Sequence, residues 1–218
     1  MTNTIIRILV AVALILGAIG AGFLEHFGIP VVRWVAAAIC AVMVLETMIL
    51  KIKDKKLCLL RCAFGAWIIL MGVSAYFIGS RPLIMLLLLL IIAATDTGAW
   101  FFGKKFGGDK MWPAISPNKT WSGQIAGIIC GTLAALLYGF IGTAAASGHI
   151  DYGQFMPQLM WIGMSVALLS QYGDLTASWI KRKLGIKDFS NMLPGHGGLI
   201  DRFDGWIYVL PVVWLVTL

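Results

Sequence analysis

Long, almost uncharged apolar stretches dominate this chain and limit the folds open to it. The first, IIRILVAVALILGAIGAGFL at residues 5–24, matches the roughly 20 residues that cross the apolar core of a bilayer as a helix. The 218-residue chain is 60% hydrophobic, has a mean hydropathy of +0.89 and is only 12% charged, about half the charge of a soluble domain. The sequence therefore predicts an all-α, polytopic integral membrane protein.

About seven stretches are expected to span the membrane as helices. The first is longer than the apolar core of a signal peptide, so we expect it to be retained. No linker, repeat or low-complexity segment is evident, which predicts a single membrane domain over residues 1–218. Within it, residues 1–80 would hold the N-terminal helices and residues 81–218 the remaining helices with most of the polar residues. The predicted spans cover residues 5–24, 31–50, 58–79, 83–103, 121–142, 157–180 and 203–218.

Basic residues alternate between the two ends of these spans. With a cytoplasmic N-terminus, 15 of the 17 Lys and Arg residues fall on the cytoplasmic side, and only Arg33 and Arg81 on the other. We therefore expect loops 104–120 and 181–202 in the cytoplasm and loop 143–156 outside. Most of the net charge of +7 follows from this topology and from attraction to anionic headgroups, so no nucleic-acid partner is expected.

Three acidic residues lie inside predicted spans, where an ionisable side chain is costly and indicates function by default. Asp96 lies among small residues and Asp174 among polar ones, and for both we favour a functional role. Glu46 is one turn from the cytoplasmic end of its span. Here we favour a structural role, in which the side chain reaches the membrane surface or pairs with Lys51 or Lys53.

The loop GGDKMWPAISPNKTWSGQIAG, which follows the fourth span, offers an anion site. Ser116 and Pro117 are typical of a turn, and Thr120 or Ser122 is expected to cap the next helix. A helix N-terminus with free amides, hydroxyl groups and Lys119 can bind an anion. An ordinary capped helix after a basic loop explains these residues equally well.

The end of the sixth span and the polar stretch after it form a second candidate site. Asp174, Ser178 and Lys181 are spaced i, i+4 and i+7, so they share one helix face. The run KRKLGIKD supplies four cations in seven residues, and the glycines of PGHGG would let backbone amides approach a phosphate. Asp201 and Asp204 are three positions apart, so they lie on the same helix face if the last helix already includes them. Because Mg²⁺ is bound by one or two carboxylates plus substrate phosphates, these groups predict a site for Mg²⁺ and a phosphate.

Residues 178–204 resemble the signature of the phosphatidate cytidylyltransferase (CDP-diacylglycerol synthase) family. They read Ser178-x-Ile180-Lys181-Arg182-x4-Lys187-Asp188-x-Ser190-x2-Leu193-Pro194-x-His196-Gly197-Gly198-Leu199-x-Asp201-Arg202-Phe203-Asp204, without departure. The stretches DTGAWFFGKKFG, SPNKTWSG and SQYGDLTAS resemble the same family, so the likeness covers most of residues 93–210. The N-terminal part resembles it more loosely, because typical members have further spans between the regions matching Glu46 and residues 51–61.

The resemblance implies that CTP and phosphatidic acid give CDP-diacylglycerol and pyrophosphate, with the lipid phosphate attacking the α-phosphorus of CTP. It implies Mg²⁺ as a cofactor, with room for a second cation. It also implies an active site that faces the cytoplasm from a bacterial inner membrane. The partners are then the two substrates and the lipid bilayer, and a homodimer is compatible with the family. No protein nucleophile is required, so positioning and charge neutralisation should dominate.

The resemblance also makes residues 81–218 the catalytic region that binds CTP and the lipid, and it assigns roles to the polar residues. Asp174, Asp201, Lys119 and His196 are the expected catalytic residues. Asp174 and Asp201 would bind the metal, with Asp204 and Asp96 as direct or supporting ligands. His196 would donate to a phosphate, and proton transfer is its weaker alternative role. Cations that neutralise phosphates are expected at Lys119, Lys181, Arg182, Lys187 and Arg202, and orienting groups at Ser116, Thr120, Ser178 and the amides of Gly197 and Gly198.

Other functions fit the sequence less well. A CTP-dependent lipid-alcohol kinase would need the same nucleotide and metal, but the length of the matching signature favours the cytidylyltransferase. A CDP-alcohol phosphotransferase is disfavoured because its run of spaced aspartates is missing. A small ion-coupled transporter would use Asp96 and Asp174 as ion sites, yet no internal repeat is visible and the polar residues gather at one end of the spans.

Overall fold

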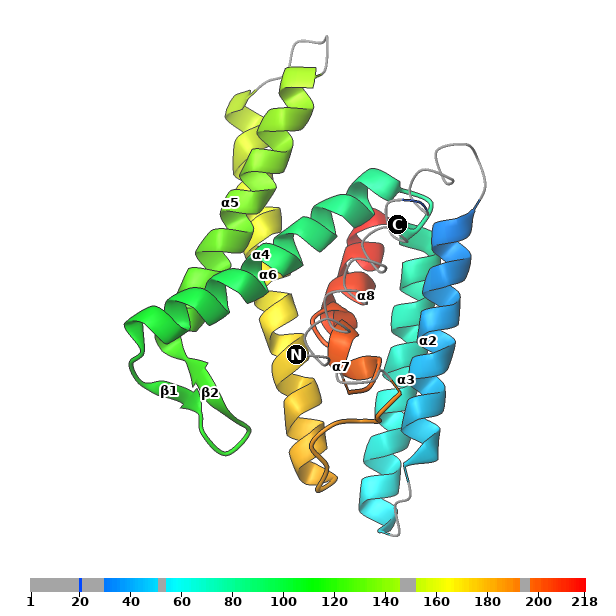
Figure 1. Cartoon of the computed structure of the whole chain (residues 1–218). Helices are drawn as coiled ribbons and strands as arrows, with labels where there is room; N and C mark the ends of the chain where they lie inside the picture. Colours follow the sequence, from blue (N-terminus) through cyan, green and yellow to red (C-terminus); the bar gives the residue numbers. More distant parts are fainter. Residues whose placement is uncertain (1–19, 21–29, 51–53, 146–151, 193–196) are drawn as a thin grey trace. The chain divides into compact units, whose positions relative to one another are not determined.

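The computed structural model describes residue 20 and residues 30–50, 54–145, 152–192 and 197–218. Nearly all of the regular structure in these residues is helical (Figure 1). The first predicted span, 5–24, lies outside them except for residue 20. The helices are α2 (Val31–Ile49), α3 (Lys55–Ile78), α4 (Pro82–Phe106), α5 (Trp121–Ala145), α6 (Tyr152–Lys183), α7 (Ile200–Phe203) and α8 (Trp206–Thr217).

Four of the helices in the described part are long and apolar enough to cross a membrane, namely α2, α3, α4 and α5. The α6 helix has 32 residues but carries Asp174 and ends in three basic residues, and α8 has only 12 residues. The predicted all-α, polytopic membrane fold is therefore confirmed, whereas the number of seven spans stays a prediction.

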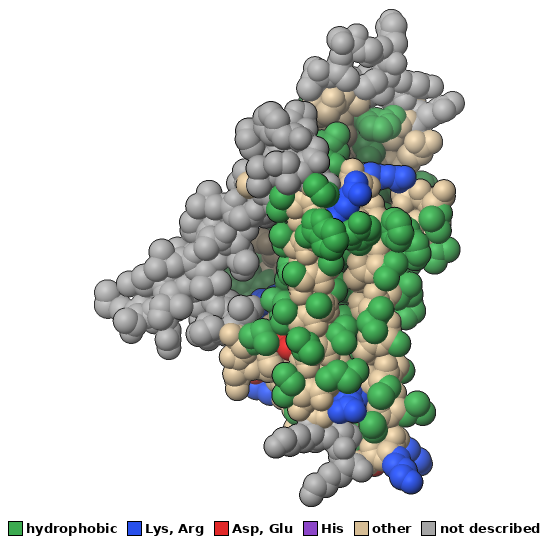
Figure 2. Space-filling view, turned by 90° about the vertical axis from the view of Figure 1, so that its right-hand side faces the viewer, with side chains coloured by type: hydrophobic (Ala, Val, Ile, Leu, Met, Phe, Trp, Pro, Cys, Tyr) green, Lys and Arg blue, Asp and Glu red, His purple; other side chains and the backbone are tan. Residues whose placement is uncertain are grey.

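The outer face of α2 and α3 is covered by hydrophobic side chains (Figure 2). Trp34, Leu45, Leu59 and Ile69 are each more than half exposed. Lysine and arginine side chains lie mainly near the two ends of this face (Figure 2). An apolar surface of this extent is what a helix pair presents to lipid, since soluble proteins rarely leave such a patch open to water.

The chain divides into two compact units, Met1–Pro82 with Ile180–Leu218, and Leu83–Trp179. In the first unit α3 packs against both α2 and α8. The indole Nε1 of Trp67 donates to the carbonyl oxygen of Ile207 at 2.9 Å, and Phe77 stacks on Trp214. The stretch after α6 also joins this unit, because Phe189 is buried and stacks on Phe64 of α3. The C-terminal polar stretch therefore packs with the N-terminal helices.

The second unit is held together by small residues. Gly123, Gly127 and Gly131 recur at every fourth position of α5, so they form one buried stripe along this helix. A Cβ atom at Gly123 would lie 2.7 Å from the carbonyl oxygen of Ala99 on α4, and one at Gly131 would lie 3.0 Å from Cβ of Ala167 on α6. Such close approach is typical of membrane helices, where packing replaces the hydrophobic effect between helices.

A short hairpin between α4 and α5 was not predicted. Strands β1 (Lys110–Trp112) and β2 (Ser116–Thr120) pair antiparallel. The prediction of a turn at Ser116 and Pro117 is wrong, because both residues lie in β2. The turn consists of residues 113–115, directly before β2, and there the amide of Ile115 donates to the carbonyl oxygen of Trp112 at 3.1 Å. Pro113 follows Trp112, at the turn position whose backbone angle proline presets.

Candidate active site

In the second unit, Lys119 of β2 and Asp174 of α6 form an ion pair. Lys119 Nζ lies 2.6 Å from Asp174 Oδ2, and the two side chains are 27% and 35% exposed. One helical turn later, Ser178 Oγ donates to Asp174 Oδ1 at 3.3 Å. The predicted shared face of Asp174, Ser178 and Lys181 is confirmed for Asp174 and Ser178, whereas Lys181 pairs with Asp201. The pair is open to solvent on one side, so a ligand can reach both charges.

Asp96 of α4 adds a second carboxylate to this group. It lies close enough to interact electrostatically with both Asp174 and Lys119. Two carboxylates and one lysine therefore gather in the second unit. We refer to Asp96, Lys119, Asp174 and Ser178 as the acidic group. Its excess of negative charge suits a cation that arrives together with a phosphate.

The hairpin and the start of α5 hold Lys119 in place. Thr120 Oγ1 accepts from the amide of Gly123 at 3.2 Å, which confirms the expected cap and assigns it to Thr120. Ser122 Oγ donates to the carbonyl oxygen of Gly107. Ser116, the other predicted orienting hydroxyl, is half-buried opposite Trp112. The Thr120 oxygen therefore anchors the helix end, and Lys119 directly before it is the hairpin residue that contacts Asp174.

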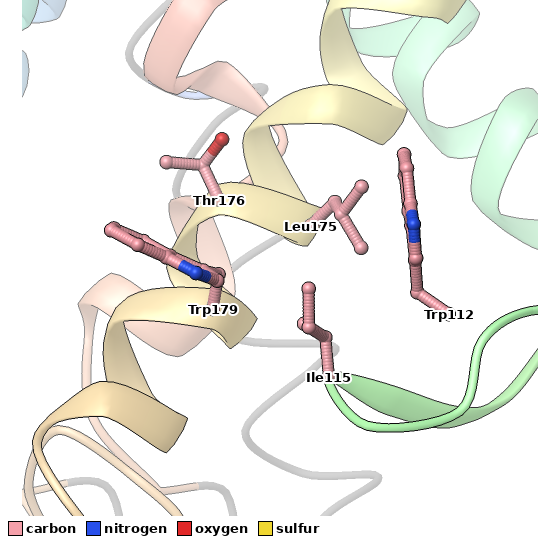
Figure 3. Close-up of a pocket in the computed structure, with 5 residues that line it drawn as sticks. All are labelled: Trp112, Ile115, Leu175, Thr176 and Trp179. Atoms are coloured by element: carbon pink, nitrogen blue, oxygen red, sulfur yellow. The ribbon is translucent and has the colours of Figure 1, made fainter.

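An apolar pocket lies between the hairpin and α6 (Figure 3). Trp112 and Ile115 line it from the hairpin side, and Leu175, Thr176 and Trp179 line it from α6. The hydroxyl of Thr176 donates to the carbonyl oxygen of Tyr172 at 2.8 Å. Leu175 of the pocket directly follows Asp174 in α6. The hairpin and α6 therefore carry both the ion pair and the apolar pocket.

In the first unit, Asp201 of α7 is the centre of a second cluster. Its Oδ1 accepts from Lys181 Nζ at 2.6 Å, and its Oδ2 accepts from the amides of Phe189 and Gly198, each at 3.0 Å. The side chains of Lys181 and Asp201 are only 12% and 4% exposed. The structure thus brings together three of the predicted site residues, Lys181, Gly198 and Asp201.

Glu46 of α2 has a different environment from the one expected. It is 1% exposed, so the expected position at the membrane surface is wrong; Lys51 and Lys53, its alternative partners, lie outside the described residues. Its Oε1 accepts from Ser190 Oγ at 2.6 Å and from the amide of Leu199 at 2.7 Å, and its Oε2 accepts from the amide of Ile200 at 2.9 Å. An acidic residue in an apolar span was the sequence feature that marked Glu46. Its partners could not be read from that feature, because the donors lie 144 to 154 positions away along the chain.

Both described glycines of the PGHGG stretch are required by their surroundings. Gly197 has φ of +82°, a conformation that favours glycine. A Cβ atom at Gly198 would lie 3.0 Å from the amide nitrogen of Ser190 and 3.1 Å from Glu46 Oε1. The amide of Gly198, expected to bind a phosphate, donates to Asp201 in this structure.

The remaining predicted site residues lie at the ends of α6 and α7 or outside the described part. Arg182, Lys187 and Arg202 are exposed. Asp204 follows the last residue of α7, and its Oδ1 accepts from the amide of Gly205 at 2.9 Å. His196 lies outside the described residues, so its predicted role stays a prediction.

The donor sets differ in how well they suit a divalent metal ion. Within the described part of the chain, no three His, Cys, Asp or Glu side chains are grouped closely enough to hold a metal. Asp96 and Asp174 nevertheless offer two partly accessible carboxylates, which would fit Mg²⁺ if phosphate oxygens and waters supplied its other ligands. Asp201 fits less well, because its oxygens already accept from three donors.

Comparison with known proteins adds to this geometry. A family model described as the cytidylyltransferase family matches residues 1–218. The phosphatidate cytidylyltransferase of Staphylococcus aureus (strain COL) is 42% identical over 126 residues, which are 57% of this chain and 45% of the relative. Those of Staphylococcus haemolyticus and Staphylococcus epidermidis are each 40% identical over 124 residues, with the same coverage. The match thus spans somewhat less than half the length of these relatives.

Proposed function

Because this chain belongs to the cytidylyltransferase family, we propose that it transfers the cytidylyl group of CTP to phosphatidic acid. The products are CDP-diacylglycerol and pyrophosphate, and the reaction serves phospholipid synthesis. The acidic group carries the proposal, since it joins a lysine to two carboxylates next to an apolar pocket. The relatives named phosphatidate cytidylyltransferase support the same choice of substrates.

In the proposed reaction an oxygen of the lipid phosphate attacks the α-phosphorus of CTP. A bond forms between them, and the bond from the α-phosphorus to the bridging oxygen of the β-phosphate breaks, so pyrophosphate leaves. No protein group needs to form a covalent bond. The protein has to align two anions that repel each other and neutralise charge on the phosphates.

Lys119 is the described cation best placed for this work in the second unit. Its ammonium group has three N–H donors, and the ion pair with Asp174 leaves others for phosphate oxygens. Asp174 holds the lysine in position, and Ser178 in turn donates to Asp174. Mg²⁺, held by Asp174 and Asp96, would supply further neutralisation of the phosphate oxygens.

We assign the apolar pocket to the lipid substrate rather than to the cytosine base. The base would bring several polar edge atoms into a pocket that offers few partners for them. The polar side-chain atoms of its lining are the Thr176 hydroxyl, which already donates to Tyr172, and the indole nitrogens of Trp112 and Trp179. Each edge atom that finds no partner there would cost about 1–3 kcal/mol. Acyl methylene groups carry no such cost, and the lipid phosphate would then lie toward Asp174.

For the first unit, taken by itself, we propose that Lys181 and Arg182 neutralise phosphates, with Asp201 holding Lys181 in place. These residues belong to the matching signature, and Asp201 contacts Lys181 directly. The distribution of basic residues favours a site that faces the cytoplasm, and the bacterial relatives favour a bacterial inner membrane.

The test is an assay of the purified protein in detergent with phosphatidic acid and doubly labelled CTP. We expect the cytidine label on the lipid, loss of the product with EDTA and recovery with Mg²⁺. The γ-phosphate label on an added lipid alcohol would instead identify a CTP-dependent kinase. If neither label reaches any lipid while the protein is folded, the proposal is wrong.

A further inference from the structure

Two buried carboxylates from different elements hold the same two pieces of chain in the first unit. Glu46 of α2 accepts from the hydroxyl of Ser190 and from the amides of Leu199 and Ile200. Asp201 accepts from the amides of Phe189 and Gly198. Each carboxylate therefore joins residues 189–190 to residues 198–200.

Both pieces belong to the stretch that resembles the family signature. Glu46 and Asp201 thus hold residues 189–190 and residues 198–200 together. The fit here is tight, because a Cβ atom at Gly198 would lie 3.1 Å from a carboxylate oxygen of either residue. The amides of residues 198, 199 and 200 are all taken by the two carboxylates, so this stretch has little freedom to shift by itself.

The arrangement connects Glu46 to the residues proposed to act on phosphates. Asp201 can hold Lys181 at 2.6 Å only while α7 keeps its position, and Glu46 binds the first amide of α7 and the one before it. A change at Glu46 would therefore reach Lys181 through α7 and Asp201. Glu46 itself is buried and directs both oxygens at these donors, so it has no direct access to a substrate.

We propose that Glu46 is a positioning residue of the transfer reaction, which holds residues 198–200 in place and through them the Asp201–Lys181 pair. The inference rests on the proposed function, because it names the reaction that this geometry serves. The competing explanation is that Glu46 only stabilises the fold. That explanation predicts less folded protein but unchanged kinetics for each folded molecule.

Three variants separate the two explanations. Glu46→Gln keeps the size of the side chain but places an NH₂ donor where an acceptor is needed. Ser190→Ala removes only one of the three donors and leaves α2 intact. Thr47→Val is the matched control, since Thr47 is equally buried on α2 but donates to Val44 of its own helix.

Two measurements are made on monodisperse protein at equal amounts of folded material. The first is kcat/KM for CTP, and we expect Glu46→Gln to lower it about 100-fold, the size of effect that a small misplacement of reacting groups produces. Ser190→Ala should lower it less, and Thr47→Val should match the wild type. The second is hydrogen exchange of the peptide over residues 197–203, which should be faster in Glu46→Gln and in Ser190→Ala.

Unchanged kcat/KM in both Glu46→Gln and Ser190→Ala would overturn the inference, and so would lost activity without faster exchange. If Glu46→Gln does not fold, Ser190→Ala decides alone: lower kcat/KM with faster exchange supports the inference, and wild-type values refute it. A folded wild-type protein that transfers no cytidylyl group would refute the proposed function instead. Hydrogen exchange alone would then show whether Glu46 holds residues 198–200.

Discussion

Replacement of Lys119 by alanine separates a catalytic lysine from one that only orients the protein in the membrane. The ion pair of Lys119 and Asp174 is short, at 2.6 Å, but the two side chains are 27% and 35% exposed. Solvent screens such a pair, so its contribution to stability is about 1 kcal/mol or less. For a protein of this size, that corresponds to a fall in Tm of about 2–4 °C at most.

The expected effect on turnover is much larger. If Lys119 donates to a phosphate whose charge grows in the transition state, its loss should lower kcat about 100- to 1,000-fold, or about 2.7–4 kcal/mol. This exceeds the loss of stability several times. Lys119→Arg should restore part of the activity, because a guanidinium keeps the charge but presents a wider planar fork than an ammonium.

The measurement is CTP turnover at matched levels of folded protein, together with thermal unfolding in the same detergent. Lys110→Ala is the matched control, because it removes the same charge from an exposed position of the same hairpin. If Lys119 serves only as one of the cytoplasmic cations, both alanine variants should behave alike. Wild-type turnover in Lys119→Ala would therefore refute the assignment of the hairpin to the active site.

Further predictions concern the carboxylates, the packing, the topology and the pocket. Asp174→Asn and Asp201→Asn should each nearly abolish turnover while the protein still extracts as a folded species; near-normal activity in either would remove that residue from the site. Gly123→Ala should destabilise the second unit by about 1–3 kcal/mol, since its Cβ would meet the backbone of α4, and unchanged thermal unfolding would contradict this packing. In a cysteine-free background, Ser80→Cys should react with an impermeant thiol reagent from outside intact cells, and protection there would reverse the predicted orientation. Leu175→Gln should raise KM for phosphatidic acid more than KM for CTP, and the opposite order would assign the pocket to the base.

The part of the fold that depends on local pattern could be predicted from the sequence. Apolar stretches of spanning length indicated the four described membrane-length helices, because the hydrogen bonds of a helix close within the segment itself. Helical spacing placed Ser178 beside Asp174 for the same reason. The cap of α5 at Thr120 likewise depends on residues only three positions apart.

Contacts between distant segments were decided by the tertiary structure alone. The partners of Glu46 come from residues 190, 199 and 200, and no local period links these positions to α2. The Gly198 amide is a second example. From the sequence it was expected to be available for a phosphate, but in the folded chain it donates to Asp201 Oδ2. The sequence determines which donors and acceptors a residue has. Whether they are free to bind a ligand depends on which chain segments pack around them.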